Sequence, residues 1–150
     1  MKKIILSLTL SAALLSSAFT YAANNNEPNV KVKQAFINEF TQAKDVEWAT
    51  ISREGVYQAK FTFNNESLQA FFTEEGEFLG TTRQITKSQL PILVATGLEK
   101  QYADARVVTI FEYSKKDGLE YYITLTTSKG SLIVKANASG ELYVHKKNLK

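Results

Sequence analysis

Apolar and polar residues alternate along most of the chain after residue 45, a pattern typical of β-strands with one buried face. In the clearest run, Tyr57, Ala59, Phe61 and Phe63 alternate with glutamine, lysine and threonine. Turns that contain glycine, asparagine or glutamate separate this run from its neighbours. In the first half of the chain we therefore expect four strands, at residues 46–51, 57–63, 68–72 and 78–84.

Two other segments show the three- and four-residue spacing of an amphipathic helix. The first begins at Val30 and has apolar residues at positions 32, 35, 36, 40 and 43, so we expect this helix to end at Asp45. The second begins at Pro91, which suits a first helical position because proline has no N–H to leave unpaired there. The apolar stripe of this second helix is Val94, Leu98 and Tyr102.

The two halves of the chain resemble each other, since residues 57–78 align with residues 121–142 at a constant offset of 64. The helices match at an offset of 62, so the second half has two extra residues in its first hairpin. An internal repeat of this length determines the architecture. We therefore expect an α+β fold made by tandem duplication of a helix plus a four-stranded antiparallel sheet, with the helices on one face. The two sheets would run together or pack closely to make one cooperative domain. The two repeats would be residues 30–87 and 88–150.

The first 22 residues have the pattern of a secretory signal peptide. Lys2 and Lys3 precede an apolar run from Ile4 to Leu15, and small residues lead to a cleavage site after Ala22. The apolar run is shorter than the ~20 residues that a membrane-spanning helix needs. We therefore expect a periplasmic or secreted protein with no stable membrane span after cleavage. Residues 23–29 are polar and would form a disordered lead-in.

Composition excludes several classes of site. The chain has no cysteine, which excludes thiol catalysis, cysteine-based metal sites and disulfides. Without Lys2 and Lys3, 16 basic residues face 15 acidic ones, which argues against nucleic acid as a partner. The only histidine is His145, and Ser131 lies in an expected hairpin turn, so no nucleophilic triad is expected. We predict no enzymatic activity, no cofactor and no metal site.

Strand alternation also assigns residues to the two faces of the sheet. Val46, Trp48, Val108 and Ile110 share the apolar parity that should meet the helices. The opposite parity is largely polar, but it also carries nine apolar, aromatic or histidine side chains, which would form a binding patch if they cluster. Cross-strand packing, or cover by a terminus or a second molecule, is the alternative. The nine residues are Ile51, Phe71, Leu79, Phe111, Tyr113, Tyr122, Ile133, Tyr143 and His145.

Several short motifs resemble the PepSY-like family of small exported bacterial proteins, also described as β-lactamase-inhibitor-like. They are Phe40-x-x-Ala43-x-x-Val46-x-Trp48, Tyr57-x-Ala59-x-Phe61, Phe72-x-x-x-Gly76, and Leu90-Pro91 with Tyr102. The resemblance spans about residues 30–149 and implies a tandem helix-plus-four-strand fold, an exported protein, no established enzymatic activity and a concave sheet that docks a protein. The β-lactamase inhibitor itself is held by disulfides, which this chain cannot form, and its contact loops have no counterpart here.

Taken together, these patterns favour a non-catalytic exported module that binds a protein or peptide of the cell envelope on the open sheet face. The alternative is a small-ligand carrier in the cell envelope with a pocket of roughly a few hundred Å³ between sheet and helices. In the first hypothesis, five aromatic residues would be anchors and two lysines would give polar selectivity at the rim. The proposed binding residues are Phe71, Phe111, Tyr113, Tyr122, Tyr143, Lys60 and Lys135.

Overall fold

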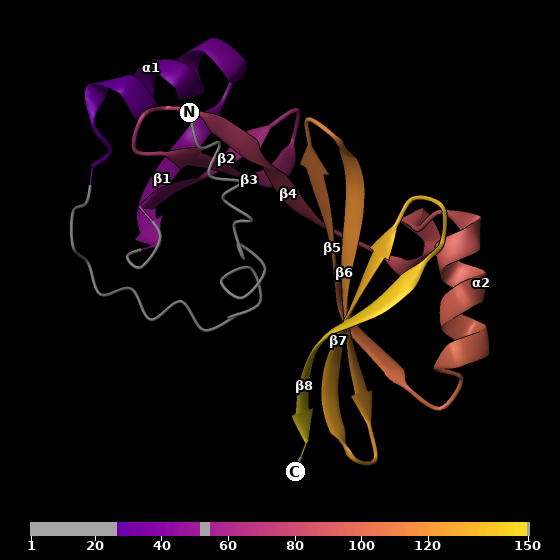
Figure 1. Ribbon diagram of the computed structural model, residues 1–150. Helices are drawn as coiled ribbons and strands as arrows, with labels where there is room; N and C mark the ends of the chain where they lie inside the picture. The colour runs from indigo at the N-terminus through magenta and orange to yellow at the C-terminus, as the bar shows by residue number, and fades with distance from the viewer. Residues whose placement is uncertain (1–26, 52–54, 150) are drawn as a thin grey trace, which may run out of the picture.

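The computed structural model describes residues 27–51 and 55–149. The predicted signal peptide and most of the predicted lead-in lie outside these residues. Within them the chain forms two α-helices, one short 3-10 helix and eight strands (Figure 1). The first half contains α1 (Val30–Glu39), β1 (Lys44–Ile51), β2 (Val56–Phe63), β3 (Glu66–Thr73) and β4 (Phe78–Ile85). The second half contains η2 (Lys87–Gln89), α2 (Ile92–Gln101), β5 (Arg106–Lys115), β6 (Gly118–Thr127), β7 (Gly130–Asn137) and β8 (Leu142–Leu149).

All eight strands form one antiparallel sheet in the order β1 to β8. The predicted fold class, a tandem pair of helix plus four-stranded sheet units, is therefore wrong. β4 pairs with β5 from Thr81 opposite Ser114 to Ile85 opposite Ile110, so the sheet is continuous through its middle. The physical reason is that two separate sheets would leave two more strand edges with unpaired N–H and C=O groups.

Both helices cover the same face of the sheet, α1 over the first four strands and α2 over the last four (Figure 1). Leu68, Arg83, Glu112 and Tyr121 are successive partners across β3 to β6, so they share a face. Leu68 packs in the core under α1 and Tyr121 in the core under α2. The halves of the sheet meet at an angle with the helices outside, which makes the opposite face concave. We call this opposite face the open face.

The core under α1 is aromatic. Phe36 is 5% exposed, and its ring centroid lies 5.2 Å from that of Trp48 and 5.0 Å from that of Phe61. Asn29 caps the helix, since its side-chain oxygen accepts a hydrogen bond from the Val32 N–H at 3.1 Å. The helix ends at Glu39, earlier than predicted. Phe40 and Ala43 follow the helix and still pack against the core from the connecting loop, which explains why the apolar pattern continues past the end of the helix.

The core under α2 is mostly aliphatic. Val94 and Leu98 are buried against strand residues of β5, β6 and β7. Pro91 is the N-cap of α2 rather than its first helical residue, a shift of one position. The buried strand residues under α2 are Ile110, Tyr121, Ile123, Leu125, Val134 and Ala136.

Two residues predicted to meet the helices do not. Val46 is 38% exposed and Val108 is 47% exposed. Each lies where the register of its strand shifts, between Lys44 and Glu47 in β1 and between Val107 and Thr109 in β5. A β-bulge places two residues opposite one, so side-chain alternation does not continue through it.

Neither α-helix in the described part of the chain is long and apolar enough to cross a lipid bilayer.

Candidate functional site

The open face holds a single apolar cluster that extends from β1 to β7 and so crosses the middle of the sheet. It contains most of the apolar residues that the alternation placed on this face, and Val56 in addition. The structure therefore brings together side chains that lie up to 82 positions apart in the sequence. The cluster consists of Ile51, Val56, Phe71, Leu79, Phe111, Tyr113, Tyr122 and Ile133.

Three of the predicted anchors form the floor of this face and are not exposed. Phe71 is 0% exposed, Tyr113 is 8% exposed and Tyr122 is 5% exposed. Gly80 allows the Tyr113 ring to lie directly on the β4 backbone, because a Cβ at Gly80 would be 2.6 Å from that ring. The Tyr113 hydroxyl donates a hydrogen bond to the Leu79 carbonyl at 3.0 Å. Burial, and then the nearby Glu120 charge, raise the pKa of Tyr113, so the hydroxyl remains a donor at neutral pH.

A charged cluster borders this floor. Glu120 Oε1 accepts from Lys115 Nζ at 2.7 Å and pairs with Lys135 Nζ at 3.0 Å, while Glu120 Oε2 accepts from the Tyr122 hydroxyl at 3.2 Å. Burial by itself would raise the pKa of Glu120, but the hydrogen bonds and charges of the two lysines outweigh it and lower the pKa. The ammonium of Lys135 also lies 5.9 Å from the centroid of the Tyr122 ring. Two lysines on one carboxylate leave the cluster with a net positive charge.

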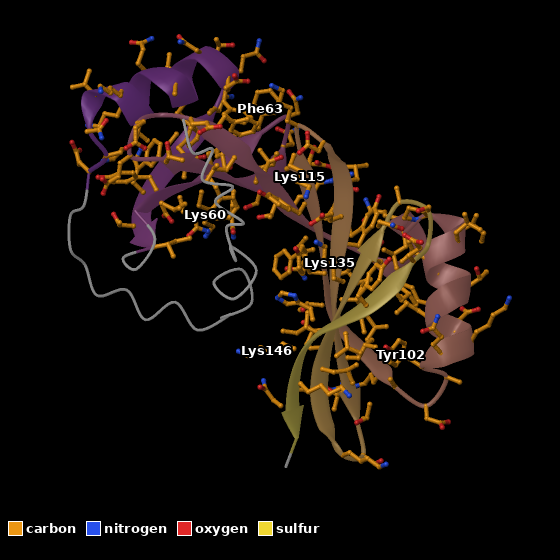
Figure 2. The ribbon with its side chains drawn as sticks, viewed as in Figure 1. Lys60, Phe63, Tyr102, Lys115, Lys135 and Lys146 are labelled. Carbon is orange, nitrogen blue, oxygen red and sulfur yellow. The ribbon has the colours of Figure 1, made fainter. Side chains whose placement is uncertain are left out.

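The remaining predicted binding residues form the rim, except Phe111, which belongs to the apolar cluster. Tyr143 is 55% exposed and pairs with Lys135 across β7 and β8. Lys60 is exposed, with its ammonium 3.9 Å from a Glu47 carboxylate oxygen. Phe111 and Lys135 are half-buried. Figure 2 shows Lys60, Lys115, Lys135 and Lys146 on the concave side of the sheet.

Sequence reasoning missed the role of Glu120 and of a buried polar group beside the floor. Gln58 is 4% exposed and Thr82 is 2% exposed. Both donate to Gln69 Oε1, from Gln58 Nε2 at 2.8 Å and from Thr82 Oγ1 at 3.4 Å. Strand alternation indicates the role of Glu120, because Glu120 and Lys135 have opposite charges and lie on the same face of neighbouring strands.

His145 lies in the register shift of β8, and its ring packs edge-on against Tyr122 with centroids 5.5 Å apart. Among residues 27–51 and 55–149, no group of three or more histidine, cysteine or carboxylate side chains could hold a metal ion.

A hollow of about 270 Å³ lies near the C-terminal end of α2. In the corresponding part of the first half, Phe40 packs against Phe61, Phe63 and Phe78 at centroid distances of 4.8 to 6.0 Å. The second half has leucine, threonine and leucine at the strand positions offset by 64, and these smaller side chains leave more space. The hollow is lined by Lys87, Leu98, Glu99, Tyr102, Ala103, Ala105, Val107 and Leu125.

Comparison with known proteins identifies the fold. The chain matches no protein-family model and no curated protein. Among solved structures it is similar to a DUF2874 family protein from Bacteroides ovatus ATCC 8483, with 17% identity, a TM-score of 0.71, and coverage of 79% of this chain and 89% of that chain. It is also similar to a BLIP-like, that is β-lactamase-inhibitor-like, protein from Bacteroides fragilis NCTC 9343, with 18% identity, a TM-score of 0.66, and coverage of 81% and 89%. A candidate periplasmic protein from Bacteroides eggerthii DSM 20697 has 16% identity, a TM-score of 0.71, and coverage of 82% and 89%. At these identities the likeness establishes a shared fold.

Proposed function

We propose that this protein is a non-catalytic, periplasmic or secreted binding module that docks a protein or peptide on its open sheet face. The observation that carries the proposal is the arrangement of that face, in which a prebuilt aromatic floor crosses the middle of the sheet under a rim of exposed Tyr143 and lysines. A concave surface with an apolar centre and a polar rim has the general form of a protein interface.

The comparisons support the proposal at the level of fold. The likeness to the BLIP-like protein from Bacteroides fragilis favours a docking role over catalysis. The candidate periplasmic protein from Bacteroides eggerthii supports the exported location, as does the signal pattern in residues 1–22. Membership of the PepSY-like family is part of this proposal and rests on the short motifs in the sequence.

The exposed and buried residues would contribute to binding in different ways. Tyr143 can bury a large area on a partner and still use its hydroxyl, and tyrosine loses little side-chain entropy on binding. Lys60 and Lys135 would select the partner by charge at the rim. Phe71, Tyr113 and Tyr122 are already buried, so they would position the rim residues without contacting a partner.

A photo-crosslinking residue at position 143 tests the proposal. The matched control is position 37, because Ile37 is also 55% exposed but lies on α1, on the covered side of the sheet. In native cell-envelope extract we expect a discrete crosslinked product from position 143 and none from position 37. The photo-crosslinking residue is a phenylalanine derivative, so it keeps an aromatic ring at position 143. Excess wild-type protein should abolish this product, and excess Tyr143→Ala, which lacks the ring, should not. Equal crosslinking at both positions, or none at 143, would show that the open face is not the docking surface.

A small-ligand carrier is a second candidate, favoured by the hollow beside α2. Its volume of about 270 Å³ exceeds the roughly 150 Å³ of an apolar cavity known to bind benzene. Leu125→Phe would place in the hollow the side chain that Phe61 supplies in the first half. Ligand-observed NMR with indole and octanoate should show saturation transfer with the wild type and its loss with Leu125→Phe. Absence of transfer in the wild type for both probes would exclude this candidate for ligands of that size.

A further inference from the structure

We propose that the occupant of the open face is an acidic polypeptide segment, a carboxylate-rich loop or peptide of another protein. This inference rests on the proposed function, because it assigns the chemistry of the partner to the same surface. It follows from the charges that the sheet register places on that surface.

Strand pairing places six basic residues on the open face, one each on β1, β2, β7 and β8 and two on β5. The carboxylates at paired positions on the same face are Glu47 and Glu120. Glu141 accepts a hydrogen bond from the side chain of Tyr143 at the rim and is a third carboxylate beside this face. The described residues as a whole have 14 basic and 14 acidic side chains, so the excess of cations belongs to this face. The six basic residues are Lys44, Lys60, Arg106, Lys115, Lys135 and Lys146.

These three carboxylates are outnumbered by the six basic residues and do not neutralise their charge. Glu120 already binds both Lys115 and Lys135 and has a side chain only 14% exposed, so it holds the two ammonium groups in place. Lys146 pairs with Ile133, which places it over the apolar cluster, and it is exposed. A concave surface lined by charges of one sign concentrates its electric field and attracts a partner of opposite sign.

The same charges argue against other occupants. A second copy of this chain, docked face to face, would bring lysines against lysines, and like charges across an interface oppose association. A purely apolar peptide would find few exposed apolar side chains, because most of the apolar cluster is buried as floor. A flat membrane surface fits a concave face poorly, since the lysines lie on the inner side of the angle between the two halves (Figure 2). A narrow acidic segment can enter the space between the two halves of the sheet, on the side where these lysines lie (Figure 2).

The test compares two short fluorescent peptides, one of alternating glutamate and serine and one of alternating glutamine and serine, by anisotropy at low and physiological salt. We expect the glutamate peptide to bind at least about tenfold more tightly than the glutamine peptide, with an advantage that decreases as salt increases.

Lys146→Glu should weaken binding of the glutamate peptide about three- to tenfold, since it replaces an attraction with a repulsion. Lys147→Glu is the matched control, because Lys147 pairs with Leu132 on the helix-covered face and the substitution changes net charge equally. It should change affinity less than about twofold.

Equal affinities for the two peptides, or equal effects of the two lysine substitutions, would overturn the inference. Phosphatidylglycerol vesicles and single-stranded DNA form two further arms. Binding to either that depends on Lys146 and exceeds binding of the glutamate peptide would replace the acidic polypeptide with that class of ligand. If crosslinking at position 143 succeeds while the glutamate peptide has no advantage, the docking function stands and only the chemistry assigned to the partner is wrong.

Discussion

Replacing Glu120 with glutamine should destabilise the protein, because this carboxylate holds the charged cluster together. Glutamine keeps the shape of the side chain but removes the charge that accepts from Lys115 and Lys135. A hydrogen bond to a charged group contributes about 1.5–3 kcal/mol when the abandoned partner is left buried. Here the lysine side chains are 32% and 34% exposed and can be hydrated again, so we expect a combined loss of about 1–2 kcal/mol. This corresponds to a decrease in Tm of about 3–6 °C for a domain of this size.

Urea unfolding followed by the fluorescence of Trp48, the only tryptophan, measures this loss. Glu66→Gln is the matched control, because Glu66 also pairs with a cation, Arg83 at 3.1 Å, but its side chain is 55% exposed. It should cost less than about 0.5 kcal/mol. If Glu120→Gln costs no more than Glu66→Gln, the charged cluster does not stabilise the fold.

The dependence on pH gives an independent check of the same reasoning. The pKa of Glu120 in the folded chain is lowered from 4.5. The stability that its charge contributes is therefore fully present above about pH 4.5 and is lost as the pH falls through the lower, folded pKa. The difference in unfolding free energy between the wild type and Glu120→Gln should be constant between about pH 5 and 8 and shrink below about pH 4.5. A difference that grows as the pH falls would refute this account.

Two further substitutions test the packing of the helices on the sheet. Phe36→Ala removes a ring that is 5% exposed and packs against several other aromatic rings, and it should cost about 3–5 kcal/mol in urea unfolding. A Cβ at Gly140, where φ is +90°, would be 2.7 Å from Leu93 Cβ, so Gly140→Ala should cost about 2–4 kcal/mol. Gly118→Ala is its control, with φ at +131° and nothing within 4 Å, and should cost only about 1–2 kcal/mol. Equal losses at the two glycines would show that the approach of the β7–β8 turn to α2 is not tight.

The alternation of residues predicted the strands and the helices correctly in kind, because burial on one face leaves a period in the sequence. The predicted fold class, in contrast, was wrong. A repeated pattern gives the content of each half, but it does not say whether β4 remains an edge or pairs with β5. The faces predicted for Val46 and Val108 were wrong because nothing in the residue types around them indicated a bulge. The first helix was predicted too long because Phe40 and Ala43 still contact the core after the helix has ended.

The face of the candidate site was predictable, but the exposure of its residues was not. Parity placed Phe71 and Tyr113 together on the open face, as the structure does. Their burial depends on the angle between the two halves of the sheet and on the contact of the Tyr113 ring with Gly80, which involve residues distant in sequence. The lysines around Glu120 were predictable from strand alternation combined with charge, because they lie on the same face as Glu120.

The burial of the aromatic floor in the unbound chain changes which residues can supply binding energy. Apolar area that is already removed from water contributes to folding and is not gained again when a partner docks. Phe71 and Tyr122 should therefore influence binding only through the stability and shape of the surface. Tyr143 and Lys146 are exposed on the open face, so they can influence affinity without changing the unfolding free energy. Such a surface is already ordered before a partner binds, so binding loses less conformational entropy. The exposed charges then determine which partner is accepted.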